Sequence, residues 1–241
     1  MTEHDTSELP PTFIAVGHGP LERPIAVRAR TGGGPGLFWL GGFHSDMKGT
    51  KAVALDAWAA EHNRACVRFD YSGHGESGGA FDEGTIGRWL EESLAVFDRF
   101  CEGPQIVIGS SMGGWIALHL ALLRQDRVKA LIGIAAASDF TKWGFADGDT
   151  AERQGLSRAF WESGQELLLL DHQIAIDCPV RLLHGELDRD VPLGVAFRTM
   201  QALRSADVQL VVLKGSGHRL SEPHEIDAIL RTVTDLLEPQ I

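Results

Sequence analysis

Short apolar runs alternate with stretches of helical periodicity along most of the chain. Eight runs are rich in β-branched and aromatic residues and short enough to be buried strands. They span residues 13–16, 25–29, 37–40, 65–69, 105–108, 130–134, 180–183 and 208–213. Five stretches carry apolar residues at the spacing of an amphipathic helix, and they span residues 45–62, 85–100, 112–125, 193–204 and 222–237. The pattern predicts an α/β protein.

The order of these elements predicts the topology of the sheet. From the third run onward strands alternate with helices, which indicates a parallel sheet covered by helices on both faces. The first two runs fit an antiparallel hairpin at one edge. We therefore expect a doubly wound, mostly parallel eight-stranded sheet within a single domain that spans residues 1–241.

One segment interrupts the alternation. Residues 138–173 separate the sixth run from the seventh and are too many for a simple crossover, so we expect a small helical cap over the carboxyl edge of the sheet. Its aromatic residues either pack the cap onto the sheet or line an acyl-binding site, and the two roles are compatible. They are Trp143, Phe145, Phe160 and Trp161. Because the cap is short, we expect a shallow acyl cleft.

The fifth run ends in the sequence GSSMGG, which is unusual between two buried elements. Residues 109–113 fit the pattern G-x-S-x-G at a strand-to-helix turn. In such a turn the glycines allow close packing of the backbone, and the hydroxyl of the central serine is exposed above the sheet. Ser111 is therefore the candidate nucleophile. The alternative is a tight glycine turn with a capping serine.

A serine nucleophile needs a base beside it and an acid that orients the base. His218 follows the eighth run after a Gly-Ser-Gly stretch and is the candidate base. Two acids, Asp188 and Asp190, follow the seventh run. We assign the acid to Asp188, since Asp190 stands before Val191-Pro192, where it is expected to cap the next helix.

The oxyanion of an acyl-transfer intermediate needs two backbone donors. One is the N–H of Met112, which follows the nucleophile at the start of a helix. The other is the N–H of Phe43, because Gly41 and Gly42 let the backbone turn after the third run. The alternative role for these glycines is a tight strand-to-helix turn alone. Lys48, Arg189 and Arg219 lie near these loops, where they either meet an anionic leaving group or remain solvated.

Several of these motifs together resemble the α/β-hydrolase superfamily across essentially the whole chain. The stretches GSSMGG, HGELDRDVP, GSGH and RFDYSGHGES carry this likeness. LGGFHSDMKGTKA, CVRFDYSGHGES and CPVRLLHG are similar to one branch, the bacterial relatives of a mitochondrial acyl-protein thioesterase and acyl-glucuronide esterase. The resemblance implies that Ser111, Asp188 and His218 are the nucleophile, acid and base, and that Phe43 and Met112 are the oxyanion donors.

The RFDYSGHGES stretch also contains two potential metal ligands, Asp70 and His74. No further ligand spacing accompanies them, so an Asx-turn that hydrogen-bonds within its loop is the preferred interpretation. We expect no metal and no cofactor.

Composition and charge limit the classes of binding partner and the cellular location that we expect. The net charge of −11 argues against nucleic acid and against anionic membrane surfaces. The first residues lack a signal-peptide pattern, and the longest apolar stretches are too short to cross a bilayer. Cys66, Cys101 and Cys178 are widely spaced and odd in number, which suggests free thiols in a reducing cytoplasm.

These observations predict a serine hydrolase that cleaves carboxylic esters or thioesters through an acyl-enzyme. The substrate is expected to be a small-molecule ester or thioester, with acyl glucuronides and acylated proteins among the candidates. One alternative is a hydrolase-fold protein that binds or signals without turnover. Another is a triad enzyme that acts on C–C or amide bonds, because a fold and a triad do not define a substrate. The sequence carries no signal of oligomeric state.

Overall fold

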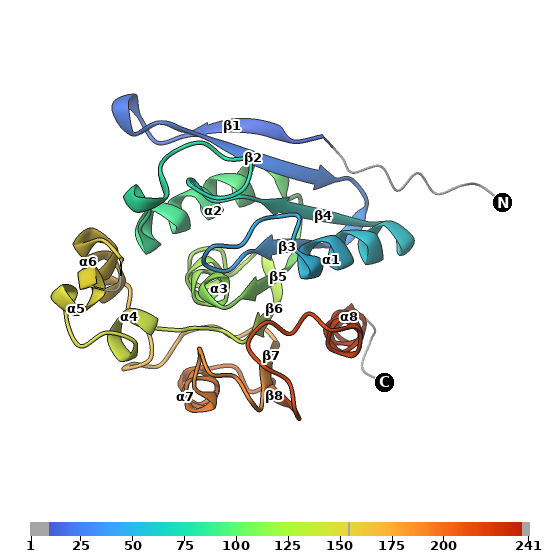
Figure 1. Ribbon diagram of the computed structural model, residues 1–241. Helices are drawn as coiled ribbons and strands as arrows, with labels where there is room; N and C mark the ends of the chain where they lie inside the picture. Colours follow the sequence, from blue (N-terminus) through green and yellow to red (C-terminus); the bar gives the residue numbers. More distant parts are fainter. Residues whose placement is uncertain (1–9, 154, 238–241) are drawn as a thin grey trace.

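An eight-stranded sheet runs through the protein in the computed structural model, which describes residues 10–153 and 155–237 (Figure 1). Its strands lie in the spatial order β1-β2-β4-β3-β5-β6-β7-β8. Their bounds are β1 (Thr12–Val16), β2 (Arg23–Arg30), β3 (Gly33–Leu40), β4 (Arg64–Phe69), β5 (Gln105–Ser110), β6 (Val128–Ile134), β7 (Val180–Gly185) and β8 (Val208–Leu213). Each strand overlaps one of the eight apolar runs.

The pairing of the strands confirms the predicted topology. β1 pairs with β2, and β2 with β4, in antiparallel orientation. The remaining neighbours pair in parallel, and all six residues of β5, at the centre of the sheet, are buried. Parallel strands end at the same edge of a sheet, so the loops after β3, β5, β7 and β8 meet there.

Helices cover both faces of the sheet, as the alternation predicted (Figure 1). α1 (Thr50–Glu61) and α8 (Pro223–Leu237) pack on one face. α2 (Ile86–Phe100), α3 (Met112–Leu123) and α7 (Leu193–Ala202) pack on the other. Two short 3-10 helices, η1 (Gly19–Leu21) and η2 (Phe81–Glu83), lie in the connecting loops.

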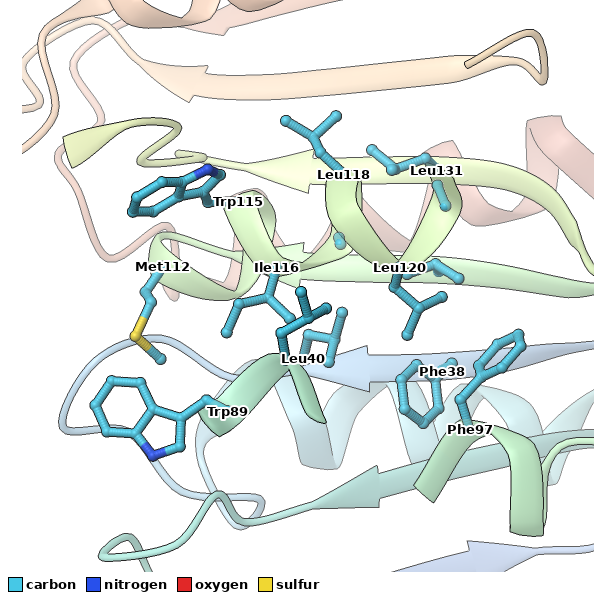
Figure 2. Packing of buried hydrophobic residues seen from close by; sticks show 14 of the residues in the cluster. Phe38, Leu40, Trp89, Phe97, Met112, Trp115, Ile116, Leu118, Leu120 and Leu131 are labelled. Atoms are coloured by element: carbon cyan, nitrogen blue, oxygen red, sulfur yellow. The ribbon is translucent and has the colours of Figure 1, made fainter. Parts of the chain in front are cut away.

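The core beneath the site consists of large apolar side chains from β3, α2 and α3 (Figure 2). Phe38 of β3 contacts Phe97 of α2 edge to face, with ring centroids 5.1 Å apart. Trp89 and Met112 lie together at the end of the core nearest the carboxyl edge of the sheet (Figure 2). Each such side chain contributes about 1.5–3 kcal/mol when it leaves water, and this packing fixes the backbone from which the site is built.

Three short helices occupy the connection between β6 and β7, at the left of Figure 1. They are α4 (Phe140–Trp143), α5 (Gly148–Arg153) and α6 (Arg158–Glu166). We call residues 138–173 the cap. Asp139 joins its two ends, since its carboxylate accepts hydrogen bonds from the amides of Leu169 at 2.9 Å and Leu170 at 2.8 Å. The Ser163 hydroxyl accepts the amide N–H of Gly87 at 2.9 Å, which ties α6 to the start of α2.

Candidate active site

Ser111 lies at the turn between β5 and α3 in a conformation that few non-glycine residues adopt. Its φ of 53° and ψ of −119° place it outside the main allowed regions. Its amide donates to the Ile134 carbonyl at 2.9 Å, and its carbonyl accepts from the amides of Gly114 and Ala137. Backbone strain of this kind costs about 1–3 kcal/mol and persists only where the surroundings enforce it.

Two glycines of the GSSMGG motif make this turn possible. A Cβ on Gly109 would lie 2.2 Å from the carbonyl oxygen of Gly113. A Cβ on Gly113 would lie 2.2 Å from the carbonyl oxygen of Leu40, at the end of β3. Side chains at either position would therefore separate α3 from the strands. The close approach also places the loop after β3 directly beside Ser111.

The structure brings the three predicted triad residues together. Nε2 of His218 lies 3.0 Å from Oγ of Ser111. Nδ1 of His218 lies 2.8 Å from Oδ2 of Asp188. An ionised carboxylate only accepts hydrogen bonds, so Nδ1 carries the proton and Nε2 accepts the serine hydroxyl. The side chain of Asp188 is 1% exposed, whereas that of His218 is 21% exposed.

The carboxylate of Asp188 is held in its ionised form by several donors. Burial alone would raise its pKa, but the hydrogen bond from His218 and those from the amides of Val191 and Asp190 outweigh it, so the pKa is lowered. Both amides donate to Oδ1 at 2.9 Å. His184, near the end of β7, lies beside the same loop, with its Nε2 2.9 Å from the Val191 carbonyl. These contacts orient the carboxylate toward His218.

The predicted capping role of Asp190 is wrong. The N-cap of α7 is Pro192, and no side chain caps the helix there. The amide of Asp190 instead donates a hydrogen bond to the carboxylate of Asp188. The side chain of Asp190 is exposed and borders a cavity beside Ser111. The hydrogen bonds to Asp188 determine the path of the backbone before α7. The Val191-Pro192 pair in the sequence does not reveal these bonds.

The predicted oxyanion donors lie on either side of the nucleophile. Met112 is the first residue of α3, so its N–H has no acceptor within the helix. Phe43 follows the end of β3, and a Cβ on the preceding Gly42 would lie 3.4 Å from Cβ of Ser111. Phe43 and Met112 line the same cavity as Ser111 and His218. The tight turn at Gly41 and Gly42 thus places the backbone of Phe43 close to Ser111.

An apolar cavity of about 200 Å³ adjoins Ser111 beneath the cap. Of the four predicted aromatic residues, Trp143 and Phe145 line it. Phe160 does not, because it is buried against Phe43, with ring centroids 5.7 Å apart. Trp161 also lies elsewhere, beside Gly148 of α5. Phe160 therefore packs the cap against the loop after β3, whereas Trp161 packs within the cap.

A second cavity, of about 440 Å³ and more polar, adjoins the other side of Ser111 and His218. Lys51 of α1 is part of its wall, and its Nζ donates to the carbonyl of Arg219. Burial lowers the pKa of this ammonium group to about 8, although the nearby Glu225 carboxylate opposes the shift. Sequence reasoning missed Lys51 because it stands in an amphipathic helical pattern without a motif.

The three cations that the sequence singled out near the catalytic loops have different positions. Arg219 lines the polar cavity, with Asp46 as the acidic member of the same wall. Lys48 pairs with Glu76 at 3.0 Å. Arg189 is exposed and belongs to the lining of neither cavity. Of the three, Arg219 is the one that lines a cavity beside Ser111.

One group of potential metal ligands occurs among the residues that the structure describes. It consists of Asp188, Asp190 and His218, with ligand atoms within 4.8 Å of one another. The Asp188 carboxylate and the His218 ring already bond each other, which leaves Asp190 as an exposed neighbour of a triad.

The parallel sheet, the strained serine at a strand-to-helix turn and the histidine beside it define an α/β hydrolase. The alpha/beta hydrolase fold family matches residues 33–155, and the chain belongs to this family. It is 35% identical to the palmitoyl-protein thioesterase ABHD10, mitochondrial, of Homo sapiens, over 90% of this chain and 79% of that protein. The predicted superfamily and branch are thereby confirmed.

Solved structures show the same relationship. The mouse alpha/beta hydrolase domain-containing protein 10 superposes with a TM-score of 0.85 at 32% identity, over 94% of this chain and 98% of that one. A putative hydrolase from Agrobacterium vitis S4 superposes with a TM-score of 0.90 at 38% identity, over 96% of this chain and all of the other. The predicted class of enzyme, a serine hydrolase of the carboxylesterase and thioesterase type, is confirmed by these relatives.

The predicted cytoplasmic location is contradicted by the same comparison. The human relative and its counterparts from Pongo abelii and Bos taurus are all named as mitochondrial proteins. The prediction depended on free thiols, and Cys66, Cys101 and Cys178 are indeed unpaired. Free thiols indicate a reducing compartment without distinguishing one from another. Within residues 10–153 and 155–237, no helix has the length and apolar character that a membrane span requires.

Proposed function

We propose that the protein hydrolyses carboxylic esters or thioesters through an acyl-enzyme on Ser111. One observation carries the proposal: the His218 imidazole lies 3.0 Å from Ser111 Oγ and 2.8 Å from Asp188 Oδ2. A protein that only binds has no need of this relay. The thioesterase relatives support a thioester or ester as the bond that is cleaved.

In the proposed reaction, His218 removes the proton of Ser111 as Oγ attacks the acyl carbon. Asp188 keeps the imidazole in the Nδ1–H tautomer and stabilises the imidazolium that forms. The amides of Phe43 and Met112 then donate to the tetrahedral oxyanion, a contribution of about 3–4 kcal/mol per donor in comparable enzymes. His218 returns the proton to the leaving alcohol or thiol, and a water activated by the same base releases the acid.

The two cavities suggest which part of the substrate lies where. The acyl chain fits the apolar cavity, whose wall includes Trp143, Phe145 and Val191. Each methylene that it buries contributes about 0.8 kcal/mol, so selectivity rises with chain length until the cavity is full. The volume of about 200 Å³ suits short and medium acyl chains. The human relative is named for palmitoyl-protein substrates, whose acyl group is long. The preferred acyl length of the present protein is therefore worth measuring.

The polar cavity suits the leaving group. Lys51 and Arg219 line it beside the reacting serine, with the hydroxyls of Thr50 and Ser221 nearby. An alcohol or thiol that carries a carboxylate would find hydrogen-bond donors and positive charge there. Acyl glucuronides and acylated proteins are the candidate natural substrates on this side.

A panel of activated esters, thioesters and amides, assayed with the wild type and with Ser111→Ala, tests the proposed function. We expect turnover of esters and thioesters by the wild type alone, and covalent labelling of Ser111 by a fluorophosphonate probe. Absence of labelling would favour a binding protein of the hydrolase fold. Preferential cleavage of amides or C–C bonds would assign the triad to another reaction.

A further inference from the structure

The loop after β4 supports the loop that carries the proposed oxyanion donor Phe43. Its first residue, Asp70, accepts the amide N–H of Met47 at 2.6 Å through Oδ1. Oδ2 of the same carboxylate accepts the amide N–H of Glu76 at 2.8 Å. One buried carboxylate therefore joins two loops. Both of its oxygens accept backbone amides, so its side chain links the backbone of the two loops.

His74, the second potential ligand in this loop, makes the contact nearest to the oxyanion donor. Its Nε2 lies 3.2 Å from the amide nitrogen of His44, and its Nδ1 lies 3.2 Å from the carbonyl oxygen of Ser72. An amide can only donate and a carbonyl can only accept, so Nε2 is unprotonated and Nδ1 carries the proton. Burial lowers the pKa of His74, which favours this neutral form.

The amide that His74 accepts belongs to a strained residue next to Phe43. His44 has a φ of 57°. This left-handed conformation costs free energy in any residue that has a side chain. On the other side of Phe43, the carbonyl of Gly42 accepts the amide of Ser45 at 3.1 Å. The peptide that contains the Phe43 N–H thus lies between two fixed points. Loss of the His44 anchor would let the backbone relax and turn that N–H away from the oxyanion.

Aromatic packing fixes the His74 ring in this position. The ring lies 5.1 Å from that of Trp89 and 5.0 Å from that of Phe81, between ring centroids. Phe81 also stacks on the His44 ring at 4.2 Å and contacts Phe43 at 5.0 Å. Because His74 is 5% exposed, water cannot readily replace it as the acceptor of the His44 amide.

We propose that His74 is a positioning residue that aligns the Phe43 amide of the oxyanion hole through its hydrogen bond with the His44 amide. The proposal rests on the proposed function, since it assigns a role within the same reaction. His74 does not touch the substrate. Its loss should therefore weaken transition-state stabilisation while substrate binding stays nearly unchanged.

The test compares three variants with the wild type on a short-chain p-nitrophenyl ester. His74→Leu removes the acceptor, His74→Gln keeps one, and Phe81→Leu alters the packing around the ring without removing the acceptor. For each variant we would measure kcat, KM and the inhibition constant of a trifluoromethyl ketone with the same acyl chain. This inhibitor adds to the serine and places an oxyanion in the hole, so it reports on alignment of the donors.

We expect His74→Leu to lower kcat by about 10-fold or more, part of the loss seen when an oxyanion donor is removed outright. The inhibition constant should rise by a similar factor, KM should change by less than about 3-fold, and His74→Gln should recover much of the loss. Phe81→Leu should lose less, because it leaves the acceptor in place. An unchanged inhibition constant in His74→Leu would overturn the proposal.

A measurement on the wild type keeps the proposal testable if His74→Leu does not fold. Nitrogen-15 chemical shifts of the ring distinguish the two neutral tautomers and the imidazolium. We expect Nε2 of His74 to be unprotonated at neutral pH. A proton on Nε2 would refute the hydrogen bond and the proposal with it. Equal hydrolysis by the wild type and Ser111→Ala would instead refute the proposed function, an outcome separate from the tautomer of His74.

Discussion

Nε2 of His218 lies 3.0 Å from Oγ of Ser111, although 107 positions separate the two residues in the sequence. The sheet accounts for this proximity. β5, which precedes Ser111, and β8, which precedes His218, are separated by β6 and β7 and point in the same direction. The loop after β8 therefore has to reach back over the carboxyl edge of two strands, and Asp188, after β7, meets the histidine on the way.

Replacement of Ser111 by alanine should remove nearly all turnover, by about 10⁴-fold or more, because the triad acts as a unit. The turn should survive, since the contacts that enforce it come from the backbone. Initial rates and near-UV circular dichroism measure the two effects. Ser110→Ala is the matched control and should keep most of the activity. Substantial activity in Ser111→Ala, or a probe adduct on Ser110, would refute the assignment of the nucleophile.

Replacement of Asp188 by asparagine should reduce kcat by orders of magnitude, because an amide no longer favours the Nδ1–H tautomer of His218. Asp190→Asn offers a control two residues away. Its exposed side chain caps no helix, so the free energy of unfolding should change by no more than about 0.5 kcal/mol. Steady-state kinetics and urea unfolding check both statements. A larger kinetic loss in Asp190→Asn would show that the acid had been misassigned.

The lowered pKa of Asp188 predicts a specific loss of stability in acid. Its folded-state pKa lies below the unfolded value of about 3.9, so the folded protein binds fewer protons at this group. The stabilisation is fully present above the unfolded pKa and is lost as the pH falls through the folded one. The difference in unfolding free energy between the wild type and Asp188→Asn should thus shrink from pH 6 toward pH 3. A constant difference over this range would contradict the shift.

The lowered pKa of Lys51, about 8, predicts an alkaline change in leaving-group selectivity. Butyryl thioesters of 3-mercaptopropionate and of its amide differ only in the charge of the leaving thiol. The kcat/KM ratio of the anionic to the neutral substrate should fall by about 2- to 5-fold between pH 7 and pH 9, the scale of one partly exposed charge pair. Any effect of pH on the acylation step itself is shared by both substrates and cancels in the ratio.

Lys51→Met is the control for this effect, and its ratio should be lower at pH 7 and constant with pH. A loss of kcat on both substrates would instead indicate that Lys51 serves mainly to hold the Arg219 carbonyl, next to His218. A ratio that does not change with pH in the wild type would remove Lys51 from the leaving-group site.

Acyl chain length should have an early optimum. In p-nitrophenyl esters, chains of about two to eight carbons should be preferred over sixteen, because methylenes beyond the apolar cavity gain little of the 0.8 kcal/mol available on burial. Phe145→Ala should weaken the discrimination between acetyl and hexanoyl esters. Phe197→Ala, an exposed position on α7, serves as the control. A higher kcat/KM for palmitoyl than for butyryl esters would show that the acyl site extends beyond this cavity.

Local sequence was enough to predict the elements and to single out the three candidate triad residues, because both depend on short-range signals. The apolar runs mark the strands, of which β5 is buried along its whole length, and the glycines around Ser111 mark a turn that only small residues permit. The start of α1 was less predictable. Helical periodicity begins at residue 45, yet the helix begins at Thr50, since the amide of Met47 bonds the distant carboxylate of Asp70.

The walls of the site depended on three-dimensional packing and were harder to predict. Trp143 and Phe160 both belong to the cap, but the first lines the cavity beside Ser111 while the second is buried against Phe43. Nothing in their sequence context separates them. Lys51 becomes a candidate only when the loop after β8 covers it and removes most of its water. Roles that depend on burial by remote segments need the fold before they can be assigned.

The cap lies between two groups of residues with complementary roles. The nucleophile and both proposed oxyanion donors precede it, in the part of the sheet that β1–β6 form, whereas the acid and the base follow it with β7 and β8. Gly155, in an exposed turn of the cap, offers a place to divide the chain. Neither fragment would hold a complete triad, and reassembly along the β6–β7 ladder would restore one. The two fragments could thus serve as a split enzyme. With each fragment fused to one of two binding partners, activity would report that the partners associate.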